Sequence, residues 1–330
     1  MQLVIDTANT SLSVKNNSFF IRSKAMERII SPARLTSIAI TTNCQINASA
    51  IKLAAENQVP IYIFNVLGQV QARMWSPYFS NTADLRKLQL KFCDTSAATQ
   101  WIISLLKRKS TLQIQTLKQS GKNRTGLLPQ IEKDIVAMAD FISSFEAQGN
   151  FLLEDCRNTI LGIEGNLSKM YFRNLSALMP VPFQFEKRSR QPALDYFNAA
   201  LNYLYGMTYS VVESGVFAKG FDPFAGYLHT DDYLKTSLVF DLIEPVRPFI
   251  DRLLIEIINA GLLTAAHFEQ KQQGYWLNKE GKKVLIPAFN DYLYRRIKSD
   301  DKFMRLKDMI FNESFALGRY IDKHFKPEQS

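Results

Sequence analysis

The chain has 330 residues, of which 46% are hydrophobic and 22% are charged. This composition supports a packed core and excludes an intrinsically disordered protein, and the length allows two domains. Lys and Arg exceed Asp and Glu by 40 − 31 = 9, so the formal net charge is +9. Such an excess favours an anionic partner, most commonly nucleic acid, although a basic protein without such a partner is the alternative.

Residues 1 to about 75 have the texture of short strands. Segments rich in Ile, Val, Phe and Thr alternate with Asn, Ser, Pro or Gly, which is the pattern of strands and turns. The predicted strands are residues 3–6, 11–15, 19–22, 35–41, 61–64 and 70–75. One helix interrupts them, because Asn47 is a suitable N-cap and alanines follow at helical spacing. We predict a small β domain at residues 1–78, followed by a linker at residues 79–84.

From residue 85 onward the spacing of apolar residues changes to that of helices. The predicted helices are residues 85–92, 97–117, 128–142, 151–178, 193–213, 237–260, 265–271, 286–296 and 303–323. We therefore predict an α+β protein, with the small N-terminal β domain followed by a larger all-helical catalytic domain at residues 85–330.

Three scattered cysteines argue against a disulfide framework or a zinc site. Cys44, Cys93 and Cys156 show no C-x-x-C spacing, so we expect reduced core thiols. The N-terminus lacks the basic and apolar regions of a signal peptide. The strongest apolar run, residues 249–263, is interrupted by Asp, Arg, Glu and Asn, unlike a membrane span. We expect a cytoplasmic protein with no membrane contact.

Candidate catalytic side chains are concentrated late in the chain. His229 lies in a segment punctuated by Gly and Pro, so a loop or a helix start presents it. Glu244 follows fifteen residues later, and Asp241 lies three residues before Glu244, so these two carboxylates share a helix face. The apolar neighbours of this pair indicate burial, and Pro245 distorts the helix. The alternatives are a hydrogen-bonded structural histidine and a surface acidic pair.

Glu164 is a third candidate carboxylate, in the segment L-G-I-E-G-N. The flanking Gly162 and Gly165 each cost a helix interior roughly 1 kcal/mol relative to Ala, which suits a place where another backbone or a phosphate comes close. A solvated helix glutamate is the alternative. One imidazole with two or three carboxylates is a suitable ligand set for Mg²⁺ or Mn²⁺.

Four cations accompany these groups: Arg188, Arg190, Lys219 and Arg247. Guanidinium and ammonium groups suit phosphate, although ordinary surface charge is the alternative for each of them. Together with the carboxylates and the imidazole, they indicate metal-dependent chemistry on nucleic acid.

Four segments, in this order and spacing, resemble the CRISPR-associated integrase family, the DNA endonuclease/integrase that captures new spacers in CRISPR adaptation. They are I-E-G at residues 163–165, the run at residues 188–198, G-F-D-P at residues 220–223 leading to the histidine, and D-L-I-E-P-V-R-P at residues 241–248. A weaker resemblance reaches the first eighty residues. The family often has an acidic residue where this chain has Pro245.

The resemblance implies that Glu164, His229 and Glu244 hold one Mg²⁺ or Mn²⁺. It implies that Asp241 supports these ligands without binding the metal, or is a weaker, optional ligand. It also implies that Arg247 neutralises the scissile phosphate.

The remaining cations, Arg188, Arg190 and Lys219, would hold the DNA backbone. The implied reaction is insertion of captured foreign DNA fragments into a CRISPR array, in which the fragment's 3′-OH attacks a phosphodiester. With water as the nucleophile the same site is a nuclease. The implied partners are duplex and branched DNA, a second copy of the chain bound through the first eighty residues, and a small companion adaptation protein that completes a heterohexamer.

Three other functions remain as alternatives. A transposon-type integrase of the same fold would insert its own ends, and we expect such enzymes to carry an additional C-terminal DNA-binding module. A non-catalytic basic DNA-binding scaffold would leave the carboxylates and the histidine incidental. A zinc hydrolase is disfavoured, because the chain has no H-E-x-x-H motif to supply a second histidine ligand.

Overall fold

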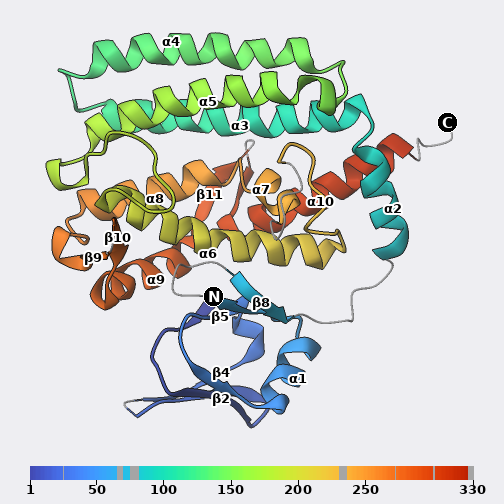
Figure 1. The fold of residues 1–330 in the computed structure, drawn as a ribbon, viewed down its shortest axis with the longest axis vertical. Coiled ribbons are helices and arrows are strands. Elements are labelled where there is room, and N and C mark those ends of the chain that lie inside the picture. The colour runs from blue at the N-terminus through green and yellow to red at the C-terminus, as the bar shows by residue number, and fades with distance from the viewer. Residues whose placement is uncertain are drawn as a thin grey trace.

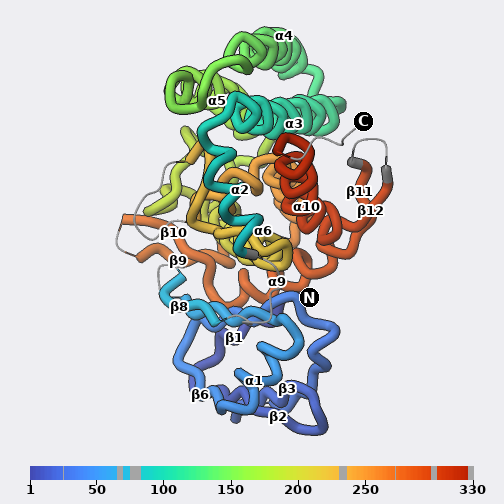
Figure 2. The backbone as a smooth tube through the Cα atoms, turned by 90° about the vertical axis from the view of Figure 1, so that its right-hand side faces the viewer, coloured from blue at the N-terminus to red at the C-terminus, as the bar shows by residue number. Residues whose placement is uncertain are grey.

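The computed structural model describes residues 1–24, 26–64, 70–74, 82–229, 236–271, 273–299 and 302–325. A β domain lies at one end of the molecule and a larger, mostly helical domain makes up the rest (Figures 1 and 2). Each part has its own hydrophobic core, one between residues 3 and 61 and one between residues 92 and 321. The predicted α+β class, with the β domain first, is confirmed.

Two four-stranded sheets form the β domain. The first sheet has the order β1-β5-β7-β8, with bounds Gln2–Ile5, Ser37–Ile40, Ile61–Phe64 and Val70–Met74. The second sheet has the order β4-β3-β2-β6, with bounds Glu27–Ile30, Ser18–Arg22, Thr10–Lys15 and Cys44–Ile46. Helix α1 (Ala48–Glu56) begins as predicted, because the Asn47 side chain accepts a hydrogen bond from the amide of Ala50. The sequence reasoning missed β4 and β6, which are short and have only one fully buried residue between them.

The helical domain is built in layers (Figure 1). Three helices pack together at the end far from the β domain: α3 (Ser96–Gly121), α4 (Leu128–Ser144) and α5 (Leu153–Leu178). Below them lie α6 (Tyr196–Lys219), α7 (Ser237–Leu242), α8 (Arg247–Asn259) and α10 (Leu306–Phe325). Two further helices, α2 (Thr82–Phe92) and α9 (Lys279–Tyr294), complete the described set. None of the described helices is long and apolar enough to cross a membrane.

Helix α6 is the central element, and local sequence sets its ends. The Asp195 side chain accepts from the amide of Asn198 at the start, and Gly220 adopts a left-handed conformation with φ of 96° at the end. Its position against the first sheet is held by buried polar contacts. The hydroxyl of Tyr62 donates to the carbonyl of Ser210 over 3.2 Å. The Arg73 guanidinium lies 2.8 Å from the buried carboxylate of Glu213 on α6.

Two predicted helices are corrected by the structure. The expected helix at residues 237–260 is two helices, α7 and α8, separated by a turn at residues 243–246. Pro245 lies in that turn, where it has no amide to continue the helical hydrogen bonding. The expected helix at residues 265–271 is a short 3₁₀ turn (Ala265–His267) followed by strand β9 (Phe268–Lys271). That strand pairs in antiparallel fashion with β10 (Gly274–Leu277), so the period-3.6 interpretation was wrong there.

A second hairpin, β11 (Arg296–Ser299) with β12 (Lys302–Arg305), also belongs to the larger domain. The domain is therefore mostly rather than entirely helical. Helix α9 begins at Lys279, before the predicted start at residue 286, because Asn278 caps it and Pro287 is accommodated inside it. Of the predicted linker, residues 79–81 lie outside the described part, and Thr82–Asp84 form the first turn of α2.

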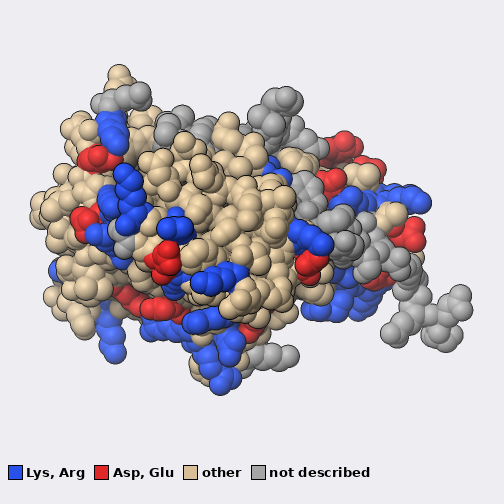
Figure 3. Space-filling model, turned by 90° about the horizontal axis from the view of Figure 1, so that it is seen from below, with Lys and Arg blue, Asp and Glu red and all other residues tan. Residues whose placement is uncertain are grey.

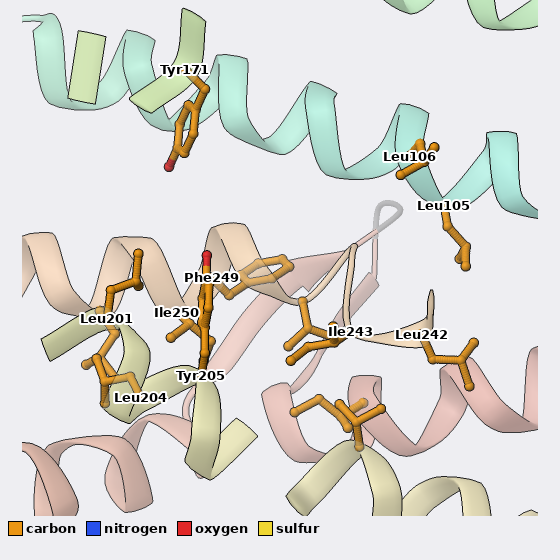
Figure 4. Close-up of a cluster of buried hydrophobic side chains, with 14 of the residues drawn as sticks. Leu105, Leu106, Tyr171, Leu201, Leu204, Tyr205, Leu242, Ile243, Phe249 and Ile250 are labelled. Carbon is orange, nitrogen blue, oxygen red and sulfur yellow. The ribbon is translucent and has the colours of Figure 1, made fainter. Parts of the chain in front are cut away.

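A tightly packed layer holds the α7–α8 turn (Figure 4). Tyr171 of α5 and Tyr205 of α6 point their hydroxyls into the space between the helices, and both donate to the buried carboxylate of Asp251 on α8, over 2.9 and 2.6 Å. Leu242 and Ile243, where α7 ends, are fully buried in the same hydrophobic cluster. The turn that carries the next residue, Glu244, is therefore fixed by the core on both sides.

Candidate active site

Glu164 and Glu244, which lie far apart in the sequence, meet at the ammonium group of Lys109. Glu164 comes from α5, Glu244 from the α7–α8 turn, and Lys109 from α3. The Lys109 Nζ contacts Oε1 of Glu164 and lies 2.7 Å from Oε2 of Glu244. The side chains of Lys109 and Glu244 are each 4% exposed, whereas that of Glu164 is 26% exposed. Two of the three predicted metal ligands thus converge on one cation position that is open to solvent on the Glu164 side.

Glu244 is held by a second cation from its own turn. Arg247 Nη2 lies 3.2 Å from Oε1 of Glu244 and donates to the hydroxyl of Tyr209 over 3.0 Å. Burial alone would raise the pKa of Glu244, but Arg247, Lys109 and then His229 outweigh burial and lower this pKa to about 2. The carboxylate is therefore ionised throughout the neutral range, as a metal ligand must be.

Glu164 has a similar but more exposed setting. Burial acts to raise its pKa, and Lys109 more than offsets that effect, so the pKa is lowered. The Ser168 hydroxyl, one turn further along α5, donates to the same Oε1 over 2.7 Å. A Cβ added at Gly162 or Gly165 would meet nothing within 4 Å. Within the protein, then, no backbone packs closely against these glycines, and the α5 surface beside Glu164 is uncovered by described residues.

Asp241 organises the segment that carries His229. Its side chain is fully buried and accepts hydrogen bonds from the amides of Tyr227, Leu228 and His229, over 2.6, 3.2 and 3.1 Å. It also lies 2.7 Å from Nδ1 of His229. Arg157 of α5 binds the same segment, because its Nη1 donates to the carbonyls of Tyr227 and Leu228 over 2.9 and 2.6 Å. With both oxygens of its carboxylate engaged, Asp241 is a positioning residue for His229.

The pairing with Asp241 also selects the tautomer of His229. A carboxylate accepts rather than donates, so in the neutral tautomer that this contact favours, Nδ1 carries the proton and Nε2 presents its lone pair. Ligating histidines commonly donate their other N–H to a carboxylate in this way. The ring is 33% exposed, and Nε2 has no hydrogen-bond partner within the described residues.

The donor set fits a divalent cation, although it is not assembled as a three-ligand cluster. Among the described residues, no group of three or more His, Cys, Asp and Glu side chains is close enough to hold a metal ion. Oε2 of Glu244 is buried and contacts the Lys109 ammonium without a well-formed hydrogen bond, so this oxygen is available to another cation. His229 acts electrostatically on Glu244. Two carboxylates and a neutral imidazole suit Mg²⁺ or Mn²⁺, so the ligand set Glu164, His229 and Glu244 stays a prediction.

The guanidinium of Arg188, a predicted DNA-binding residue, is engaged in hydrogen bonds within the protein. Its Nη1 donates to Oδ1 of Asn198 over 2.8 Å, and its Nη2 donates to Oδ1 of Asn202 over 2.6 Å. The guanidinium lies 5.5 Å from the centre of the Tyr205 ring. These contacts tie the loop that begins at residue 188 to α6, so we expect the main effect of Arg188 to be on the fold of that loop.

Of the other predicted DNA-binding cations, Arg190 is exposed, Lys219 is half-buried and Arg247 is buried beside Glu244. Arg190 lines a cavity of about 650 Å³ together with Tyr203 of α6 and Tyr275 of β10. Lys219, at the end of α6, lies over the ring of Phe315 at 5.8 Å. Within the described part of the chain, neither Arg190 nor Lys219 forms an ion pair or a hydrogen bond with Glu164 or Glu244. The face seen from below shows more Lys and Arg than Asp and Glu, in several separate groups (Figure 3).

Sequence reasoning missed Lys109, although a signal was present. In α3 the buried residues recur at helical spacing through the position of this lysine: Ile102, Leu105, Leu106, Lys109, Gln113 and Thr116. A lysine on the buried face of an amphipathic helix requires an acidic partner, because a buried charge is otherwise too costly. The pattern thus predicts a buried ion pair on α3, but not which carboxylates complete it.

Comparison with known proteins identifies the family. The profile described as "CRISPR associated protein Cas1" matches residues 3–291. The chain belongs to the Cas1 family. A curated relative, "CRISPR-associated endonuclease Cas1 1" of Archaeoglobus fulgidus, is 26% identical over 308 residues, which cover 89% of this chain and 88% of the relative.

Solved structures share the Cas1 fold with this chain. "Casposase bound to integration product" superposes with a TM-score of 0.82 at 22% identity, covering 100% of this chain and 94% of that one. A chain of a "Cas6-RT-Cas1--Cas2 complex" has a TM-score of 0.79 at 21% identity, covering 98% of this chain and 35% of that one. At such identities the likeness shows the fold alone.

Proposed function

We propose that this Cas1-family chain is a divalent-metal-dependent DNA endonuclease and integrase. It would insert captured DNA fragments into a CRISPR array by attack of a fragment's 3′-OH on a phosphodiester. The observation that carries the proposal is the convergence of Glu164 and Glu244 on one cation position. Asp241 orients His229, which acts electrostatically on Glu244. The activity named for the curated relative, endonuclease, supports the proposal.

Each side chain of the site has a separate task. Glu164, His229 and Glu244 would hold one Mg²⁺ or Mn²⁺, which, when bound, polarises a phosphodiester and makes a hydroxyl more acidic. Asp241 orients the imidazole. Arg247, whose Nη2 lies 3.2 Å from Glu244, would neutralise a phosphate that approaches the same position.

DNA binding and assembly are proposed on broader grounds. The net charge of +9 favours the phosphate backbone, and we assign the exposed Arg190 and the half-buried Lys219 to backbone contacts. We propose a homodimer formed through the β domain. A small companion protein would complete a heterohexamer, and a matching solved structure whose title names both Cas1 and Cas2 supports such a partner. Duplex and branched DNA are the expected substrates.

A transposon-type integrase is the second candidate, because the casposase structure matches over the whole chain. The two functions differ in the DNA that they insert. A CRISPR integrase accepts fragments of unrelated sequence and inserts them at a repeat, whereas a transposon-type enzyme prefers its own terminal sequence. Competition between an arbitrary duplex and candidate element ends, both offered with one target, separates them.

The decisive test measures strand transfer and branched-DNA cleavage with Mn²⁺ and with EDTA. Wild-type protein should act only with the metal, and Glu244→Gln should be inactive. Glu256→Gln is the matched control, because Glu256 is a half-exposed acid of α8 that pairs with Arg295. Full activity in EDTA, or full activity of Glu244→Gln with Mn²⁺, would overturn the proposal.

A further inference from the structure

The site is electrically balanced before any metal or DNA arrives. A partly exposed carboxylate, Glu164, and a buried one, Glu244, face two buried cations, Lys109 and Arg247. The ammonium of Lys109 contacts both carboxylates at once.

A divalent cation that joined this site alone would meet an unfavourable field. It would seek the same oxygens that Lys109 already contacts, and it would leave two surplus positive charges in a place largely withdrawn from water. Electrostatic repulsion is strong where the effective dielectric constant is low. Because the Lys109 side chain is only 4% exposed, its ammonium cannot be solvated where it stands.

A DNA phosphate removes this conflict. It supplies a negative charge and acceptor oxygens, and the lysine's flexible four-carbon stem lets its ammonium turn from the carboxylates toward that new acceptor. The approach is open on the side of Glu164, whose side chain is 26% exposed and whose neighbouring glycines have free space above them.

We propose that Lys109 occupies the cation position between Glu164 and Glu244 until a DNA phosphate draws it away, so that metal and DNA bind cooperatively. This inference rests on the proposed metal dependence and adds an order of binding to it. Lys109 is then a positioning residue in the free protein and a phosphate contact in the DNA complex. A lysine that only held the fold together would not couple the two ligands.

The test is Mn²⁺ binding, followed by the electron paramagnetic resonance signal of the free ion. Wild type, Lys109→Gln and Lys107→Gln are titrated as full-length proteins, with and without a dideoxy-terminated duplex, and the binding of Mn²⁺ to DNA alone is subtracted. Lys107 is the matched control, since it lies on the same helix and pairs with Glu146 near the surface. Glutamine keeps most of the length of lysine but not its charge.

DNA should tighten Mn²⁺ binding to wild type and to Lys107→Gln by roughly 5–150-fold, the usual range for two coupled ligands. Lys109→Gln should bind Mn²⁺ without DNA at least about tenfold more tightly than wild type does, and DNA should add little. Lys109→Arg, which keeps the charge, should retain the coupling.

Three results would count against the inference. Equal Mn²⁺ affinities of wild type and Lys109→Gln, with equal effects of DNA, would overturn it and leave the metal-dependent function standing. Binding of Mn²⁺ to wild type that is equally tight with and without DNA would do the same, even if Lys109→Gln failed to fold. If Mn²⁺ bound to none of the proteins under any condition, the metal dependence itself would fall, and the inference with it.

Discussion

Nδ1 of His229 lies 2.7 Å from Oδ1 of Asp241, and the Asp241 side chain is fully buried. This contact joins α7 to the segment that carries His229, and it leaves Nε2 of the imidazole free of Asp241. The same carboxylate accepts three backbone amides. The pair therefore acts as one unit, in which Asp241 fixes both the place and the tautomer of the histidine.

Asp241→Asn should weaken metal binding without abolishing turnover. The new amide nitrogen would face a backbone N–H or Nδ1–H that the carboxylate had satisfied, so the His229 segment loosens. Groups behind metal ligands typically change affinity or activity by roughly 10–100-fold. A Mn²⁺ titration of strand transfer should show a higher half-maximal concentration and retained turnover at saturation. Glu244→Gln should stay inactive at every concentration, and the reverse pattern would show that the two roles are exchanged.

Glu244→Ala should reduce stability as well as activity, whereas His229→Ala should reduce activity alone. Loss of Glu244 leaves Lys109 and Arg247 without their shared buried partner, and breaking a buried ion pair costs about 3–5 kcal/mol. His229 is a third exposed, and its loss leaves Asp241 with three amide donors. Denaturant unfolding and strand-transfer assays on the same preparations check both results; equal stability of the two variants would contradict the buried-pair argument.

Asp251 should make stability fall as pH rises from about 4 to about 6. Burial raises the pKa of Asp251 from 3.8 to about 6, against the hydrogen bonds from Tyr205 and Tyr171. The folded protein therefore binds the proton more tightly than the unfolded chain, so its contribution is complete below pH 4 and is lost through pH 6. The difference amounts to about 3 kcal/mol.

The comparison between wild type and Asp251→Asn isolates this effect. Lost hydrogen bonds shift the variant's free energy of unfolding by a constant amount, while its pH slope between 4 and 6 should be flatter. Parallel slopes for the two proteins would show that Asp251 does not titrate in this range.

DNA affinity should fall steeply with salt. The slope of log K against log[salt] should be near −0.9 for each phosphate neutralised on duplex DNA. Arg190→Ala should make that slope shallower by roughly one contact. Arg188→Ala should instead lower the melting temperature, because its guanidinium is bonded to Asn198 and Asn202. Fluorescence anisotropy at several salt concentrations, beside thermal melts, separates the two arginines; a flat salt response would contradict electrostatic binding.

The β domain should mediate dimerisation through an edge strand. Strand β4 is an edge of the second sheet, and Ile29 on it is 51% exposed. Edge strands with exposed apolar side chains favour pairing with another chain. Ile29→Lys should shift full-length protein toward the monomer in sedimentation velocity. Val136→Lys, at a 65% exposed position on α4 at the opposite end of the molecule, should not; a monomeric wild type would contradict the prediction.

Local sequence determined much of this fold. Period-2 and period-3.6 patterns separated the β domain from the helices, because each pattern reflects one buried face of a single element. Asn47 predicted the start of α1, because its side chain can accept a hydrogen bond from an amide of the first turn. The histidine and the carboxylates were found from residue type and spacing, together with the family resemblance, because the ability to bind a metal depends on the side-chain type, which the sequence states directly.

Tertiary structure alone decided how these groups act. Lys109 lies on α3, Glu164 on α5 and Glu244 after α7, so their ion pairs depend on how three distant segments pack. Asp241 became the support of His229 for the same reason. The hairpin at β9 and β10 formed because antiparallel pairing between two strands outweighed a helical pattern in one of them. Local patterns specify which face of an element is buried, whereas partner identity depends on contacts between elements.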